Sequence, residues 1–160
     1  MHELIGIIVK AEDKEDAEDQ AQSYLDQTLR NAHPVIDYGM PNRDGRGFGD
    51  RADTSCVVSD SGQELVDRLM GDTEATIKGA LDAIREGLMV MSNDDIWADD
   101  TDGYTLRYHM SEVGSYGGPA IRLYDEEWSG TEGIRSVGSL NGARKGWTDK
   151  HYIVPMDIHF

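Results

Sequence analysis

The stretch ELIGIIVKA, at residues 3–11, decides the fold because it has the composition of a β-strand. Side chains of an extended chain alternate between two faces, which places Ile5, Ile7 and Val9 on one face and Ile8 on the other. A strand with apolar residues on both faces is typical of the interior of a sheet. The sequence therefore predicts that the chain begins with a central strand.

A helix with an acidic start follows this strand. Residues 12–19 contain six carboxylates and a single base, Lys14. Asp13 is a candidate N-cap. Apolar residues then recur at helical spacing, at Ala17, Ala21, Tyr24, Leu25 and Leu29. Acidic side chains are favoured at a helix N-terminus, and the others fall away from the apolar stripe. We therefore interpret the acidic cluster as a cap and a solvated surface rather than a catalytic site.

The middle of the chain combines a long connection with a long helix. Residues 35–38 are a candidate short strand, and residues 39–55, rich in Gly and Arg, are predicted to be a long loop. Ser61 and Glu64 have the spacing of a capping box. The apolar stripe behind them predicts a helix that continues to about residue 90.

The last third of the chain changes to the alternation typical of strands. After an acidic loop over residues 92–103, residues 104–111 alternate between apolar and polar, which predicts a half-buried strand. We expect it to form a hairpin with residues 120–125. Residues 129–148 are rich in Gly and Ser and are predicted to be a second long loop.

The chain ends in a further candidate strand, and the order of elements then sets the fold class. Pro155 cannot donate a hydrogen bond to a neighbouring strand, so it indicates an edge strand or a bulge.

The elements together predict a single α+β domain over residues 1–160. We expect two layers, with a mostly antiparallel sheet of four to five strands and two helices on one face. The favoured topology is a ferredoxin-like split βαβ arrangement.

The composition indicates adaptation to high salt. The 160 residues carry 31 acidic and 15 basic side chains, which gives a formal charge of −16. Such a charge repels the compact state, but in about 1 M salt the Debye length falls to about 3 Å and the repulsion is screened. We therefore expect a halophilic source. An acidic mesophilic protein and a nucleic-acid mimic are the alternatives.

Other features favour a cytoplasmic protein. No signal-peptide pattern and no apolar run of about 20 residues is present, so we expect no membrane partner. Cys56 is single and cannot form an internal disulfide, which fits a reducing compartment. The negative charge opposes nucleic-acid binding.

Several segments resemble a group of small uncharacterised haloarchaeal proteins. They are HELIGIIVKA at 2–11, VGSYGGPAIRLYD at 113–125, GIR at 133–135 and VPMDIHF at 154–160. The resemblance covers mainly the strands and contains no motif of known chemistry. It implies an origin in a halophilic archaeon or its virus, and it implies no activity, substrate or cofactor.

The strongest candidate binding surface in the sequence is locally basic. Residues 133–148 contain no acid, whereas Arg135, Arg144 and Lys145 are present. The loop at 39–55 adds three further bases, Arg43, Arg46 and Arg51. Guanidinium groups and Gly-rich backbone suit a phosphate or carboxylate. The alternative is that these bases pair with acids of the same chain.

A second candidate is a metal site where the chain ends meet. Asp157 and His159 share one face of a strand, about 7 Å apart. If the first and last strands pair antiparallel with matched ends, His2 approaches His159. The three residues could then form a two-histidine, one-carboxylate site. The alternative is a pair of solvated chain ends.

From these observations we expect a non-enzymatic cytoplasmic accessory or binding protein without a cofactor. It would present the basic segment to a protein partner or a small anion, and a homodimer is an open alternative. The rival hypothesis is a small metal-dependent hydrolase that uses acids and histidines on strands, namely His109, Asp125, Asp157 and His159.

Overall fold

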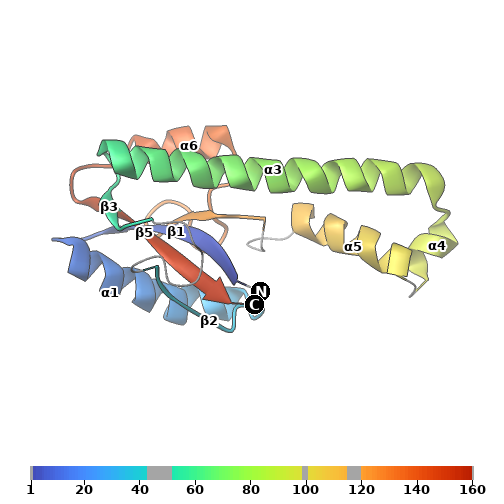
Figure 1. Ribbon diagram of the computed structural model, residues 1–160, viewed down its shortest axis with the longest axis horizontal. Helices are drawn as coiled ribbons and strands as arrows, with labels where there is room; N and C mark the ends of the chain where they lie inside the picture. Colours follow the sequence, from blue (N-terminus) through green and yellow to red (C-terminus); the bar gives the residue numbers. More distant parts are fainter. Residues whose placement is uncertain (1, 43–51, 99–100, 115–119, 160) are drawn as a thin grey trace.

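The computed structural model describes residues 2–42, 52–98, 101–114 and 120–159 (Figure 1). Its strands are β1 (His2–Lys10), β2 (Tyr38–Pro41), β3 (Ser55–Cys56), β4 (Leu123–Asp125) and β5 (His151–His159). Its α-helices are α1 (Lys14–Tyr24), α2 (Arg30–Ala32), α3 (Asp60–Val90), α4 (Asn93–Trp97), α5 (Thr101–Gly114) and α6 (Val137–Arg144). A π-helical segment, η1 (Leu25–Leu29), joins α1 to α2.

The sheet is mixed, and β1 lies in its interior as predicted. The strand order is β2-β5-β1-β4, and β3 also pairs with β5. β1 is antiparallel to β5 from His2, opposite His159, to Lys10, opposite His151. It is parallel to β4. β2 and β3 are both antiparallel to β5. The predictions of an α+β fold and of a mostly antiparallel sheet with four to five strands are therefore confirmed.

Helices cover both faces of the sheet, so the prediction of two helices on one face is wrong. On one face, Ile5 and Ile7 of β1 belong to a buried cluster with Ala17 and Ala21 of α1. On the other face, Ile8 belongs to a second cluster with residues of α3 and α6. Figure 1 accordingly shows α1 and α3 on opposite sides of the sheet. The ferredoxin-like arrangement is not observed, because β1 is apolar on both faces and needs a cover on each.

β5 is a central strand, which corrects the expectation drawn from Pro155. It lies between β1 on one side and β2 with β3 on the other. The carbonyl oxygen of Pro155 accepts a hydrogen bond from Asn42 N at 2.8 Å. In an antiparallel pair the N–H and C=O of one residue point to the same neighbour, so the N–H that proline lacks would face the β2 side of β5, just beyond Pro41, where β2 ends. Pro155 therefore lies between the segment of β5 that pairs with β2 and the segment that pairs with β3.

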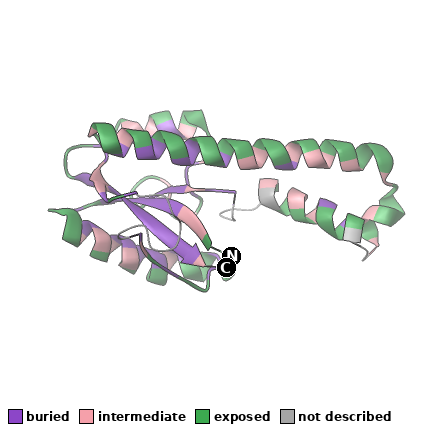
Figure 2. Cartoon of the chain, viewed as in Figure 1, coloured by how far each residue is buried: buried purple, intermediate pink, exposed green. Residues whose placement is uncertain are grey.

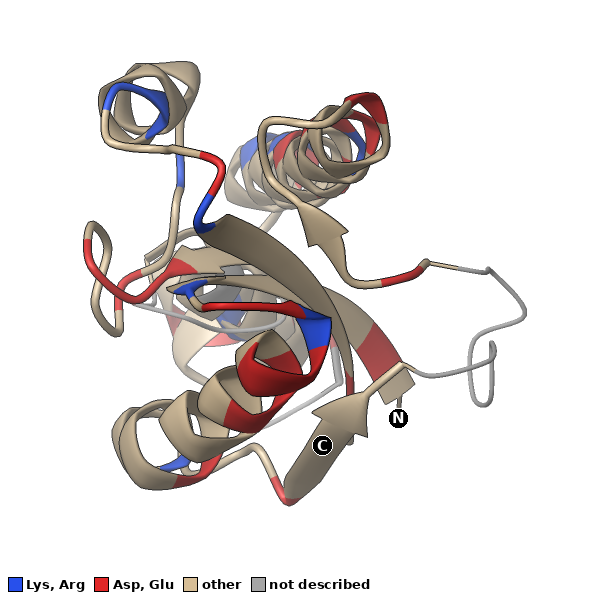
Figure 3. Cartoon of the chain, turned by 90° about the vertical axis from the view of Figure 1, so that its left-hand side faces the viewer, with Lys and Arg blue, Asp and Glu red and all other residues tan. Residues whose placement is uncertain are grey.

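The two main helices begin with side-chain caps. As predicted, Asp13 caps α1 by accepting a hydrogen bond from Asp16 N at 2.9 Å. Figure 3 shows the acidic positions on the first turns of α1. The cap of α3 is Ser59, which accepts from Gly62 N at 3.2 Å, so the predicted capping box at Ser61 is wrong. No helix in the described ranges is both long enough and apolar enough to cross a membrane.

The C-terminal half of α3 extends beyond the sheet and pairs with α4 and α5 (Figure 1). We call this layer the arm and define it as residues 71–98 and 101–114. The predicted strand at 104–111 is wrong because these residues belong to α5, which packs on α3. The hairpin with residues 120–125 is wrong for the same reason, since β4 pairs with β1. The predicted acidic loop contains α4.

The predicted loop at 129–148 is corrected in part, because it contains α6. Ser136 and Ser139 form the capping box that starts this helix, and Leu140 and Ala143 pack in the core beneath it. Of the predicted loop at 39–55, residues 43–51 lie outside the described residues, and its ends contribute to β2 and β3.

Candidate functional site

Large apolar side chains are exposed on the arm. Met89 is 86% exposed, Val90 is 82% exposed and Trp97 is 88% exposed. Three others are exposed as well, Leu88, Tyr104 and Tyr108. We call these six side chains the apolar tip. Figure 2 shows that buried residues concentrate around the sheet, whereas the arm is mostly exposed. Several large exposed apolar side chains in one part of a fold are a feature of interaction sites in soluble proteins.

A groove between α3 and α5 lies beside the apolar tip. It has a volume of about 550 Å³ and is lined largely by apolar side chains, including Met89, Val90 and Leu106. Its polar lining comes from Glu86, Asp102, Thr105 and His109. A groove between two helices with apolar walls and a few polar groups suits the apolar face of a further helix.

Hydrogen bonds fix the short helix α4 against α5 at the end of the arm. The Ser92 hydroxyl accepts from Asp95 N at 3.2 Å, and the Asp95 carboxylate accepts from Ser92 N at 2.9 Å. The Ser92 hydroxyl and backbone N–H lower the pKa of the Asp95 carboxyl. Arg107 of α5 donates to the carbonyl oxygens of Ile96 and, at 2.9 Å, Ala98. These contacts fix the backbone on both sides of Trp97 at the end of the arm.

The arm is acidic, and its basic side chains are already engaged within it. Residues 71–114 contain ten acidic and three basic residues. Lys78 pairs with Glu74, and Arg85 pairs with Asp82 at 2.7 Å. The third base is Arg107, which is bound to carbonyl groups as described above. The charge that the arm presents to a partner is therefore negative.

Comparison with known proteins places this structure in a family. A model of the family described as a domain of unknown function, DUF7995, matches residues 1–160. The chain belongs to the DUF7995 family. No curated protein and no solved structure matched it. The DUF7995 match covers the arm as well as the sheet.

Two of the predicted basic residues of this DUF7995 chain interact with groups of the same chain. Arg144 of α6 forms an ion pair with Asp67 of α3. The Arg135 side chain donates to the carbonyl oxygen of Glu132 at 3.3 Å. Lys145 is the residue at which α6 ends. The other three predicted residues, Arg43, Arg46 and Arg51, lie outside the described residues. An anion site at these positions stays a prediction.

The predicted metal residues of the DUF7995 chain, His2, Asp157 and His159, lie close together because β1 and β5 pair with matched ends. His2 Nδ1 lies 3.0 Å from Asp157 Oδ1, and the His2 and His159 rings have centroids 4.9 Å apart. His159 Nδ1 lies 3.3 Å from Asp37 Oδ2, so each histidine faces a different carboxylate. Within the described ranges no group of three or more His, Cys, Asp or Glu side chains could hold a metal ion.

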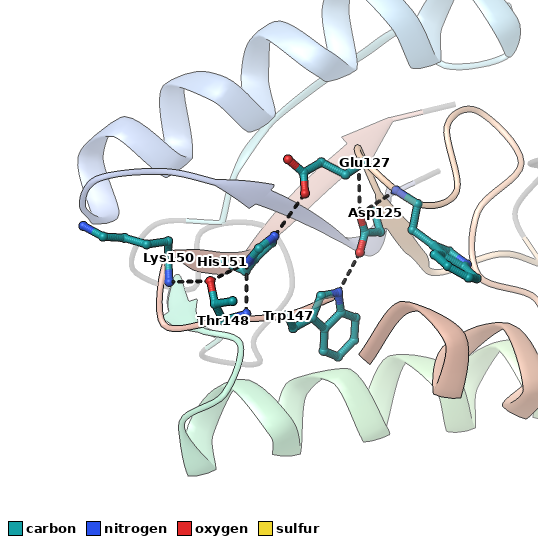
Figure 4. Close-up of polar contacts among 7 residues, drawn as sticks. Asp125, Glu127, Trp147, Thr148, Lys150 and His151 are labelled. Atoms are coloured by element: carbon teal, nitrogen blue, oxygen red, sulfur yellow. Dashed lines mark hydrogen bonds and ion pairs between the residues drawn. The ribbon is translucent and has the colours of Figure 1, made fainter. Parts of the chain in front are cut away.

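The residues of the predicted hydrolase are distributed over different parts of the fold. His109 lies on α5 and lines the groove of the arm. Asp125 is the last residue of β4 and is buried, and its carboxylate accepts from Trp147 Nε1 at 2.7 Å and from the backbone N–H groups of Glu127 and Trp128 (Figure 4). Three donors satisfy this carboxylate, which gives it the role of a structural anchor.

The histidine that begins β5 is held by hydrogen bonds on both ring nitrogens. His151 Nδ1 accepts from Thr148 N at 3.0 Å, so the proton lies on Nε2, which donates to Glu127 Oε2 at 3.2 Å (Figure 4). This buried imidazole therefore fixes the turn that precedes β5. Sequence reasoning missed this network because its members are far apart in the chain.

Sequence reasoning also missed the apolar tip of the DUF7995 chain. The predicted stripe of the long helix ran through Leu81, Ile84 and Leu88. Met89 and Val90 lie outside that stripe and would have signalled a second apolar surface at the end of the helix.

Proposed function

We propose that this chain is a non-enzymatic binding protein that holds a protein partner on the apolar tip of its arm. The observation that carries the proposal is the exposure of Met89, Val90 and Trp97 at the end of a projecting pair of helices. Burial of a Val, Leu or Met side chain at an interface contributes about 1.5–3 kcal/mol, and aromatic residues are frequent interface anchors. Six such side chains in one region provide the apolar centre of a binding surface.

The polar groups of the fold support binding rather than catalysis. Asp125 and His151 use their polar atoms to fix backbone and side chains of the same chain. The groove of the arm is mainly apolar and opens to solvent beside Met89 and Val90. Such a surface suits docking of another protein. We further propose that the binding takes place in the cytoplasm of a halophilic archaeon, which the acidic composition favours.

Site-specific photo-cross-linking tests this function. Trp97→benzoylphenylalanine places the cross-linker on the tip, and Trp128→benzoylphenylalanine places it on an exposed tryptophan outside the arm. We expect a defined cross-linked protein from a haloarchaeal extract at position 97 and not at position 128. The identified partner, purified separately, should then bind the Met89→Ser/Val90→Ser double variant about tenfold or more weakly than the wild type.

The control for this experiment is a pair of exposed apolar residues away from the arm. Val35→Ser/Val137→Ser removes two exposed valines of the body and should leave the affinity unchanged. Equal cross-linking at positions 97 and 128, or unchanged affinity of the tip variant, would contradict the proposal.

A further inference from the structure

Within the described residues, α3 and α5 form a two-helix layer of the arm, and the groove between them opens to solvent. Leu106 of α5 packs against Gly87 of α3, and Leu106 is buried. Met89 and Val90 line the groove beside this contact and remain exposed. Helical layers bury their apolar stripes against further elements, and a helix placed over the groove would cover these side chains.

The residues that line the groove indicate how long such a helix would be. On α5 the lining runs from Asp102 to His109, which corresponds to about 10 Å of helix. A helix of about two to three turns would therefore cover the lining of the groove. Segments of this length are common ligands of apolar grooves.

The charge of the arm selects the kind of helix that fits. Glu86 of α3 and Asp102 of α5 contribute carboxylates to the lining of the groove. The arm carries eight acidic and three basic residues, and the three bases are bound to groups of the arm. A partner with Lys or Arg at the flanks of its apolar face is therefore complementary in charge.

The same charge disfavours the two other occupants of an apolar surface. At contact distances, which molar salt screens least, a second copy of this chain would place its own carboxylates against those of Glu86 and Asp102. The headgroups of an anionic lipid surface would be disfavoured at the same contacts.

We infer that the arm binds a basic amphipathic helix of a protein partner, with the apolar face of that helix in the groove between α3 and α5 and its Lys or Arg residues beside Glu86 and Asp102. This inference rests on the proposed function, because it specifies the partner of the same surface. The bound helix would form a three-helix layer with α3 and α5 and would bury the apolar side chains of the groove.

Titration of the full-length protein with model peptides tests the inference. The probe is a roughly 14-residue fluorescent Leu/Lys peptide with an amphipathic helical pattern, matched to the length of α5. Its control has the same composition in a scrambled order that destroys the apolar face. We expect the scrambled peptide to bind about tenfold more weakly, and a Leu/Glu peptide of the original pattern to show no binding.

Variants of the protein then locate the binding site. Met89→Ser/Val90→Ser should weaken binding of the Leu/Lys peptide about tenfold, and Glu86→Gln/Asp102→Asn should weaken it about threefold to tenfold. Glu15→Gln/Asp19→Asn removes the same charge from the exposed surface of α1 and should leave the affinity unchanged. Circular dichroism of each variant checks that the helices are retained.

Four outcomes would overturn the inference. They are equal binding of the scrambled peptide, unchanged affinity of the tip variant, a dimer that the tip variant dissolves in light scattering, and stronger binding to anionic vesicles than to the Leu/Lys peptide. If any of these results is found together with a specific cross-link at position 97, the proposed function stands. Only the inference that the partner is a basic amphipathic helix is then wrong. Absence of that cross-link would remove the proposed function itself.

Discussion

Gly87 of α3 lies in direct contact with Leu106 of α5, and this contact joins the two helices of the arm. A Cβ atom at position 87 would lie 2.8 Å from Leu106 Cδ1 and 3.1 Å from its Cδ2. Both are closer than ordinary carbon contacts, so any larger residue must displace the leucine. Glycine is disfavoured inside a helix by about 1 kcal/mol, and here it permits the close approach of α5.

Alanine at position 87 is therefore predicted to weaken the arm. Overpacking against Leu106 costs about 1–3 kcal/mol, which outweighs the gain of about 0.5–1 kcal/mol in helix propensity. Gly79→Ala is the matched control, because nothing lies within 4 Å of a Cβ at that position. Amide hydrogen exchange in α5 should be faster in Gly87→Ala than in Gly79→Ala. Equal protection in the two variants would show that the contact does not hold the arm.

Thr73 is predicted to be the most sensitive polar residue of α3. Its side chain is fully buried, its hydroxyl donates to the Leu69 carbonyl oxygen at 2.9 Å and it accepts from Arg122 N at 3.0 Å. Thr73→Val leaves the Arg122 N–H without its acceptor and should lower the free energy of unfolding by about 1–3 kcal/mol. Urea denaturation measures this loss. Thr76→Val, in which the lost hydroxyl is exposed, should change stability by less than about 0.5 kcal/mol.

Alkaline pH is predicted to unfold the protein through its buried tyrosines. Burial is the main cause that raises the pKa of Tyr24 and Tyr124 well above the ordinary value of 10.0. The unfolded chain therefore loses these protons first as the pH rises. The free energy of unfolding should be steady below about pH 9 and fall above about pH 10, by about 1.4 kcal/mol per pH unit for each tyrosine.

Tyr124→Phe should make this alkaline decline less steep, because one titrating group is removed. Tyr104→Phe, at an exposed position, should leave the slope as it is in the wild type. Unfolding curves between about pH 8 and pH 11 give the comparison. A slope that is the same in all three proteins would mean that other groups cause the decline.

Salt is predicted to stabilise the protein. With a formal charge of −16, repulsion among carboxylates opposes folding at low ionic strength. The melting temperature should therefore rise between about 0.1 M and about 2 M KCl, since the Debye length shortens over this range. Scanning calorimetry at several salt concentrations is the measurement. A melting temperature that stays constant or falls would count against adaptation to brine.

The parts of the fold that sequence could predict are those set by local patterns. The composition of β1 indicated a central strand, and the spacing of Ala17, Ala21, Leu25 and Leu29 placed α1 and η1 on the core. Asp13 was recognisable as a cap because its side chain acts only on neighbouring backbone. The matched ends of β1 and β5 were also predictable, and they bring His2 to His159.

The parts that could not be predicted depend on contacts between distant segments. Residues 104–111 alternate as a strand would, yet they form a helix because Leu106 is buried against α3. Alternation over eight residues does not distinguish a strand from a helix that has one narrow contact. Pro155 is tolerated in a central strand because its partners β2 and β3 are short, which is a property of the tertiary structure.

The apolar tip is another feature that the sequence could not predict. Met89 and Trp97 are apolar residues at positions that face solvent, and only the position of the arm beyond the sheet reveals that nothing in the described part of the chain covers them. The predicted basic segment, by contrast, was identified from charge alone, and its Arg144 is engaged by Asp67.

α3 is one unbroken helix that connects the sheet to the end of the arm. The helix starts above the sheet at Asp60 and ends at Val90, and its 31 residues correspond to about 46 Å. A helix of this length curves only gently, so we expect a tilt of its outer end near Val90 to be shared by the turns of Leu65 and Leu69 that pack against the sheet. The arm and the segment where β3 joins the helix are thus connected by one continuous element.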